Sequence, residues 1–458
     1  RNASSVPNAR YPSAGSFAIW WRASGVPRAA VNMPRPAKSR FALRSRRWTA
    51  RRSLAKRLRS ASSTGLWNRS HTSEIGTLTR VLSSVNDSSA RVVRRDFVKT
   101  LGAAAAAGLA SSPASAQGYS FQSRWRGSRV WVGPEYWANP LQNWRVDDGE
   151  AIAKATAGRT LHLLTHQAIE AEGDLRTEVT VRLASGDAGE TWAGFQLGIR
   201  GGLPGYQHAL IHPETGVSAG VRGDGRLFVE DALSDEAVSL DAPVKLSLEA
   251  APDGQVTLKA GSVSVAATLA PGDLTGNLAL AAQAPGRATA ETSGVEWGFR
   301  DWKAGGSRLA SRPEQTFGPI LWTQYTLSRG TLKLMALFPP IGDSDEWSAR
   351  LEVRGRSGWS EAAQAPIERL SRTALFRVDD WDDTRDQDYR VVYRWQGENH
   401  QWSGVVRRDP RGEPQLRVGV FSCDHGECFP QQRMVRNIQL QDPDVVFFAG
   451  DQIYEVYG

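Results

Sequence analysis

Val244-Lys245-Leu246-Ser247-Leu248, followed shortly by Asp253-Gly254, is the most informative stretch for the fold. Apolar and polar residues alternate in the first run, which is the period of a β-strand with one buried face. An Asp-Gly pair between two such runs predicts a hairpin, because both turn positions favour positive φ. Similar alternating segments recur with turn residues between them across residues 119–305. The sequence therefore predicts an antiparallel β-sandwich of jelly-roll type there.

Three phrases in this region resemble the concanavalin-like sandwich modules found beside bacterial hydrolases. They are Trp144-Arg145-Val146, the run Trp192–Gly198 and the run Gly220–Gly225. Such modules often bind sugars by stacking aromatic rings on them, so the resemblance implies a glycan as a possible partner. The aromatic candidates for stacking are Trp131, Tyr136, Trp137 and Trp192. Because a sandwich also needs large core residues, each of them has core packing as its alternative role.

A second β-rich region follows a plausible linker at Ala304–Pro313. Residues 314–412 read as a series of short strands, which predicts an immunoglobulin- or fibronectin-like sandwich. An acidic stretch at 379–388 has two interpretations, a calcium loop or a solvated loop.

Composition and charge exclude some functional classes. Residues 1–99 hold 21 Lys and Arg against 3 Asp and Glu, whereas the remaining 359 residues hold 35 against 45. The basic charge therefore belongs to the N-terminal segment, and no nucleic-acid-binding module is expected in the globular part. The 2 cysteines exclude a disulfide framework. No apolar run approaches the roughly 18 residues that a transmembrane helix needs.

Residues 91–116 have the layout of an export signal. A charged start, Arg94-Arg95-Asp96-Phe97-Val98-Lys99, precedes the weakly apolar run Leu101–Ala110 and the small-residue site Ala114-Ser115-Ala116. The paired arginines followed by Phe and Lys resemble the twin-arginine signal of bacteria. This resemblance implies cleavage after Ala116, the twin-arginine export machinery as a partner, and a periplasmic or secreted location.

Residues 1–90 are rich in Arg, Ser, Ala and Pro and show no sustained period, so they are expected to be disordered. A signal peptide belongs at an N-terminus. We therefore expect this stretch to be a spurious extension of the reading frame, with translation starting near residues 81–93. A genuine basic targeting arm is the alternative.

The C-terminal residues 415–458 have a different character, with a strand, a helix and a second strand in succession. Leu416–Phe421 and Val445–Ala449 are apolar runs, and Gln431–Leu440 between them has the pattern of an amphipathic helix. This order predicts a parallel strand pair with ligands beyond the carboxyl ends of the strands. Cys423 and Asp451 follow these two strands, so we expect them to lie close together.

Three side chains at these strand ends are candidate metal ligands: Cys423, Asp451 and Tyr454. A thiolate and a phenolate suit a highly charged ion such as Fe(III), and a carboxylate can bridge two cations that activate water against a phosphoester. Other roles stay open for each residue. Cys423 could be a small buried residue or form a disulfide with Cys428, Asp451 could be an incidental loop acid, and Tyr454 could be a packing residue.

The same residues resemble the alkaline phosphatase D family of metallophosphatases. The resemblance lies in Phe421-Ser422-Cys423, which is one residue tighter than the family pattern, and in Gly450-Asp451-Gln452-Ile453-Tyr454-Glu455. It implies an α/β metallophosphatase domain whose Fe(III) is bound by Cys423 and Tyr454 and bridged by Asp451 to Ca(II) or another divalent cation.

The sequence thus predicts an exported metal-dependent phosphatase or phosphodiesterase acting on a phosphoester substrate. We expect residues 1–458 to be inactive alone, because three ligands do not complete a two-metal site. The alternative function is that of a secreted carbohydrate-binding β-sandwich protein.

Overall fold

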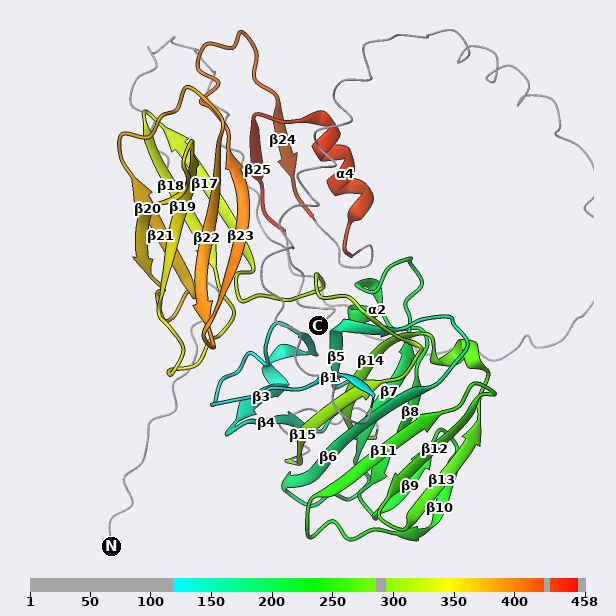
Figure 1. Ribbon diagram of the computed structural model, residues 1–458. Helices are drawn as coiled ribbons and strands as arrows, with labels where there is room; N and C mark the ends of the chain where they lie inside the picture. The colour runs from blue at the N-terminus through cyan, green and yellow to red at the C-terminus, as the bar shows by residue number, and fades with distance from the viewer. Residues whose placement is uncertain (1–117, 286–293, 424–428, 452–458) are drawn as a thin grey trace, which may run out of the picture. The chain divides into compact units, whose positions relative to one another are not determined.

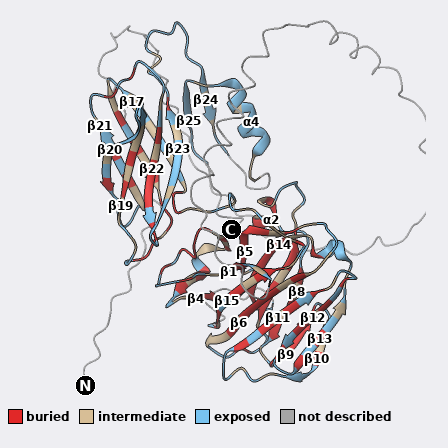
Figure 2. Ribbon diagram, viewed as in Figure 1, coloured by how far each residue is buried: buried red, intermediate tan, exposed pale blue. Residues whose placement is uncertain are grey.

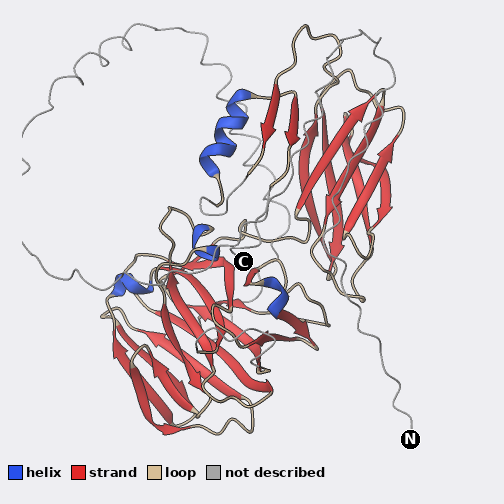
Figure 3. Ribbon diagram, turned by 180° about the vertical axis from the view of Figure 1, so that it is seen from behind, coloured by secondary structure: helices blue, strands red, loops and turns tan. Residues whose placement is uncertain are grey.

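The computed structural model describes residues 118–285, 294–423 and 429–451, which fall within one compact unit of the chain, residues 89–458. Strands dominate these residues, and the helices are few and mostly short (Figures 1 and 3). The described part of the chain is therefore mainly β, as the sequence predicts. None of its helices is both long and apolar enough to cross a membrane. The predicted signal peptide and the 1–90 segment lie outside the described residues.

The first sandwich consists of two antiparallel sheets. Sheet A contains, in spatial order, β13 (Val263–Thr268), β12 (Gln255–Ala260), β11 (Val244–Ala250), β6 (Leu175–Ser185), β15 (Glu296–Gly305), β4 (Glu150–Lys154) and β3 (Trp144–Asp147), with β1 (Tyr119–Gln122) paired to β15. Sheet B contains β10 (Ala232–Ala237), β9 (Arg226–Val229), β8 (Val217–Arg222), β7 (Trp192–Ile199), β14 (Gly276–Gln283), β5 (Thr160–Ala168) and β16 (Leu309–Ser311), with β2 (Tyr136–Asn139) paired to β5. Three short helical turns accompany them: η1 (Leu141–Asn143), α2 (His208–Ile211) and η2 (Pro271–Leu274).

Alternation along the strands builds the core between these sheets. In β11 the side chains of Val244, Leu246 and Leu248 are buried, and Lys245 between them is exposed. The inward-facing residues of both sheets join one hydrophobic cluster, which Figure 2 shows as the buried strands of this sandwich. The core therefore follows directly from the period-two pattern in the sequence.

The predicted hairpin at Asp253-Gly254 joins β11 to β12, but its turn differs from the expected one. Gly254 alone has positive φ, at +87°, and its N–H donates to the carbonyl of Ala251 at 3.0 Å. The carboxylate of Asp253 accepts a hydrogen bond from the N–H of Gln255 at 3.0 Å. A four-residue connection needs positive φ only at its last position, which is why Asp253 keeps ordinary backbone geometry.

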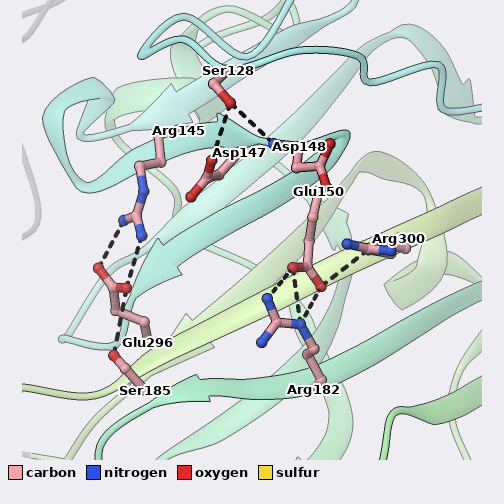
Figure 4. A network of polar contacts seen from close by, with 9 residues as sticks. All are labelled: Ser128, Arg145, Asp147, Asp148, Glu150, Arg182, Ser185, Glu296 and Arg300. Carbon is pink, nitrogen blue, oxygen red and sulfur yellow. Dashed lines mark hydrogen bonds and ion pairs between the residues drawn. The ribbon is translucent and has the colours of Figure 1, made fainter.

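Two charge networks lie on the polar side of sheet A (Figure 4). Glu150 is 1% exposed and accepts a hydrogen bond from Arg182 at 2.9 Å, and Arg300 lies 3.5 Å from it. Arg145 forms a bidentate pair with Glu296 at 2.7 and 2.9 Å. Hydrogen bonding within this pair raises the pKa of Arg145 and lowers that of Glu296. These pairs join β3, β4, β6 and β15, so their role is structural.

The second sandwich has one three-stranded and one four-stranded antiparallel sheet. The smaller sheet contains β17 (Trp322–Ser328), β18 (Thr331–Leu337) and β21 (Thr373–Val378), and the larger contains β20 (Gly358–Pro366), β19 (Ser348–Gly355), β22 (Gln387–Trp395) and β23 (Glu398–Val406). Their inner faces share a second hydrophobic cluster. Trp131, from the segment between β1 and β2, belongs to this cluster and is 0% exposed.

The C-terminal part contains β24 (Val418–Phe421), α4 (Gln432–Gln441) and β25 (Val445–Phe448). The two strands pair in parallel, with Val418 opposite Val445, as the sequence predicts. This unit consists of two strands and one helix, and no residue of α4 or β25 is buried. The prediction of an α/β metallophosphatase domain is wrong on the described residues. They contain this single strand–helix–strand unit and no further part of such a domain.

Candidate functional site

The structure brings two of the three predicted metal ligands together. Cys423 and Asp451 follow the parallel strands, and Cys423 Sγ lies 3.7 Å from Asp451 Oδ2. The backbone N–H of Cys423 donates to the carbonyl of Gly450 at 3.3 Å, which holds the two strand ends side by side. Cys423 is an exposed free thiol. Tyr454 and Cys428 lie outside the described residues, so the ligand assignment of the three residues stays a prediction.

The sequence predicts a pair of metal ions, Fe(III) with Ca(II) or another divalent cation. This prediction is wrong on the residues that the structure describes. Across 118–285, 294–423 and 429–451, no group of three or more His, Cys, Asp or Glu side chains could hold a metal ion. A thiol and one carboxylate are too few donors for a two-metal centre. The acidic stretch at 379–388 forms internal contacts instead; for example, Asp382 accepts from Thr384 and pairs with Arg385.

Of the four aromatic residues proposed for sugar stacking, two lie in a hydrophobic core and two lie at the surface. Trp131 and Tyr136 are 0% and 1% exposed and belong to the two hydrophobic cores. Trp137 and Trp192 are half-buried. Adjacent residues of a strand face opposite sides of the sheet. Trp137 therefore faces outward from sheet B, because its neighbour Tyr136 lies in the core. Trp192 also faces outward, because its neighbour Ala193 lies in the core. Both half-exposed tryptophans therefore lie on the outer face of one sheet.

Trp137 is occupied by contacts within the chain. Its ring packs edge-on against Phe317 with centroids 4.8 Å apart, and its indole N–H donates to Asn139 at 3.1 Å. The segment that contains α2 also covers this end of sheet B, since Asn139 donates to the carbonyl of Leu210 and Ala209 packs on Ala279. Trp137 is thus less available to a ligand.

Trp192 lies at the other side of the same face, in a group of polar and aromatic side chains. Its ring meets Phe228 edge-to-face with centroids 5.1 Å apart. The exposed guanidinium of Arg222 lies 5.4 Å from the Phe228 ring centre. The amide of Gln196 donates to the hydroxyl of Ser218 at 3.4 Å. We call these five residues, Trp192, Phe228, Arg222, Gln196 and Ser218, the Trp192 patch.

Strand register explains how the patch is laid out. Between β7 and β8, Trp192 is opposite Arg222, Gly194 is opposite Gly220, and Gln196 is opposite Ser218. An aromatic and cationic row is therefore separated from an amide and hydroxyl row by two residues without side chains. An apolar ring with a few planar polar groups around it is a common composition of small-molecule sites.

Sequence reasoning singled out Trp192 but missed its partners. Alternation along β7 was enough to place Gln196 on the same face as Trp192, because they are separated by an even number of residues. Arg222, Ser218 and Phe228 come from β8 and β9, and only the strand pairing brings them beside Trp192.

Comparison with known proteins gives no family assignment. No family model and no curated protein matches the chain. Among solved structures, the carbohydrate recognition domain of Emp47p has a TM-score of 0.28 and 10% identity, covering 38% of this chain and 89% of that domain. The Ca²⁺-bound exoplasmic/lumenal domain of VIP36 has a TM-score of 0.25 and 9% identity, covering 38% and 84%. A structure of botulinum neurotoxin type C, whose cell entry depends on two ganglioside molecules, has a TM-score of 0.23 and 7% identity, covering 64% and 90%.

These similarities are too weak to carry any argument about function. The resemblance to alkaline phosphatase D-type metallophosphatases is not supported, because no family model and no curated protein matches the chain. The described residues also lack a metal-binding group. The prediction of a metal-dependent phosphatase or phosphodiesterase with a phosphoester substrate is therefore wrong on these findings, and the predicted export machinery has no support in them.

Proposed function

We propose that this chain is a carbohydrate-binding β-sandwich protein and that a glycan binds at the Trp192 patch on the outer face of sheet B. The observation that carries the proposal is the half-exposed Trp192 ring beside the exposed Arg222 guanidinium. The C–H-lined face of a sugar ring can pack on an indole, and its hydroxyl groups need planar polar partners nearby.

The layout of the patch fits an extended sugar. Trp192 and Gln196 lie at the two ends of this layout, with Gly194 and Gly220 buried between them. Arg222 offers five N–H donors to hydroxyl oxygens, while Ser218 can both donate and accept. The other half-exposed tryptophan, Trp137, is engaged by Phe317 and is assigned no direct role.

The proposal includes the finer features of the fold and the location. We propose that the first sandwich is a concanavalin-like jelly-roll, in keeping with its two eight-stranded antiparallel sheets, and that the second is immunoglobulin-like, in keeping with its sheets of three and four strands. A periplasmic or secreted location, where extracellular glycans are accessible, is proposed from the signal-like sequence at 91–116.

The test is binding of the full chain to an oligosaccharide array, followed by calorimetric titration of the best ligand. Replacing Trp192 with Ala should weaken binding at least tenfold, whereas Trp192→Phe, which keeps an aromatic face, should retain most of the affinity. The matched control is Trp359→Ala, which removes a tryptophan that is 37% exposed on the second sandwich. Absence of binding to every glycan on the array, or full affinity in Trp192→Ala, would refute the proposal.

A further inference from the structure

The C-terminal unit, made of β24, α4 and β25, exposes more apolar surface than the rest of the described chain. Of the eighteen large apolar side chains that are exposed in the described residues, ten lie within residues 416–448. Their exposures run from 39% to 73%, and Figure 2 shows the helix and the two strands as largely exposed. Apolar residues scattered singly over a surface are ordinary, whereas a concentration of this kind marks an interaction surface.

One face of the strand pair consists of Val418, Val420, Val445 and Phe447, and we call it the Val420 face. Val418 is opposite Val445 and Val420 is opposite Phe447, and residues two positions apart on a strand share a face. All four side chains are between 43% and 61% exposed. Neither strand contains a charged residue or a proline. Because parallel sheets occur almost only with both faces covered, this face needs a covering element.

The helix α4 is amphipathic, but its apolar stripe is open as well. Met434 and Val435 are 39% and 45% exposed, and Ile438, one turn further on, is half-buried. These three positions lie on one side of a helix. No residue of α4 is buried. The described part of the chain therefore carries an apolar helix stripe and an apolar sheet face, and neither of them is covered.

The two open surfaces match each other in length. The ten residues of α4 extend over about 15 Å, and a strand of four residues spans about 13 Å. Ten apolar side chains at these exposures present on the order of 800 Å² of surface, which is about what each partner buries in a standard protein interface. The largest apolar patch on a typical monomer measures about 300–600 Å². The available surface is thus large enough for a stable contact between two chains.

We propose that this surface is covered by a second copy of the chain, with α4 of each copy packed on the Val420 face of the other. A twofold arrangement covers both surfaces of both copies, because the same pair of complementary patches meets twice in an isologous interface. An unrelated partner would have to supply a helix stripe and a sheet face together, whereas a second copy has both. This dimer goes beyond the proposed glycan binding and does not rest on it.

The experiment is analytical ultracentrifugation of the full chain over a series of concentrations. The mass at high concentration should be twice the 50.0 kDa of one chain. Val420→Lys on the sheet face and Val435→Lys on the helix each place a charge in the apolar contact, and each should raise the dissociation constant of the dimer about a hundredfold or more. Both side chains are exposed in the single chain, at 61% and 45%, so the substitutions should leave it folded. Far-ultraviolet circular dichroism of the variants checks this.

The matched control is Leu375→Lys, which changes an apolar residue that is 62% exposed on β21 of the second sandwich. It should leave the dissociation constant unchanged. A mass of one chain at every concentration would overturn the proposal, and so would growth into species larger than a dimer, since a twofold contact closes on itself. If only one of the two variants weakens the dimer, the packing of helix on sheet is wrong.

Discussion

His162 is a buried titratable residue on the outer side of sheet B. It is 1% exposed, its Nε2 lies 3.1 Å from the hydroxyl of Thr160, and its Nδ1 has no partner among the described residues. Burial lowers the pKa of His162 to about 3, well below its ordinary value of 6.5. The folded state therefore keeps this ring neutral at pH values where the unfolded chain is already protonated.

The sign of the resulting pH dependence follows from proton binding. Between pH 6.5 and pH 3 the unfolded state binds the extra proton, so the contribution of His162 to the free energy of unfolding falls as pH falls, and this contribution is constant above the window. His162→Asn removes the titrating group and should reduce the loss of stability between pH 7 and pH 5 by about 2 kcal/mol. Urea unfolding at both pH values measures this difference.

Thr160→Val is the control for His162→Asn. It removes the hydroxyl partner and keeps the imidazole, so it should lower stability at both pH values and preserve the drop between them. An unchanged drop in His162→Asn would show that this ring is not the group that titrates.

At the scale of single elements, much of the strand structure was predictable because burial on one side of a sheet imposes a period of two. The alternation in β11 and the parallel order of β24, α4 and β25 were both readable in the sequence. Which aromatic residues face outward was not, since adjacent residues such as Tyr136 and Trp137 take opposite faces and a shift of one position reverses them. The Trp192 patch depends on pairing between strands β7, β8 and β9, which no local pattern encodes.

The close approach of β7 and β8 at Gly194 gives a prediction for these elements. A Cβ atom on Gly194 would lie 2.3 Å from the carbonyl oxygen of Ala219 and 2.4 Å from Gly220 Cα, both of which are backbone atoms. Gly194→Ala should therefore push the strands apart and destabilise the protein by about 1–3 kcal/mol in a urea titration. Gly272→Ala is the matched control, because nothing lies within 4 Å of its added Cβ. A near-neutral Gly194→Ala variant would mean that the strands separate without strain.

At the scale of the described part of the chain, the segment between β1 and β2 contributes to two hydrophobic cores. Trp125 of this segment and Tyr136 at the start of β2 belong to the core of the first sandwich, whereas Trp131 between them belongs to the core of the second. The ring centroids of Trp131 and Trp395 are 5.0 Å apart. The backbone N–H of Trp131 donates to the carbonyl of Pro340 at 3.3 Å. The stability of the second sandwich should therefore depend on a residue that precedes it by nearly 200 positions.

Trp131→Ala tests this dependence. Loss of a fully buried indole should destabilise the second sandwich by about 3–5 kcal/mol, because a cavity remains in its core. Hydrogen exchange followed by mass spectrometry should show faster exchange in β18 and β22, with β7 and β14 of the first sandwich unaffected. Trp322→Ala, at a residue that is 36% exposed on β17, should have an effect of less than about 1 kcal/mol. If exchange accelerates equally in both sandwiches, they unfold as one cooperative unit, and the effect of Trp131 is not confined to the core in which it is buried.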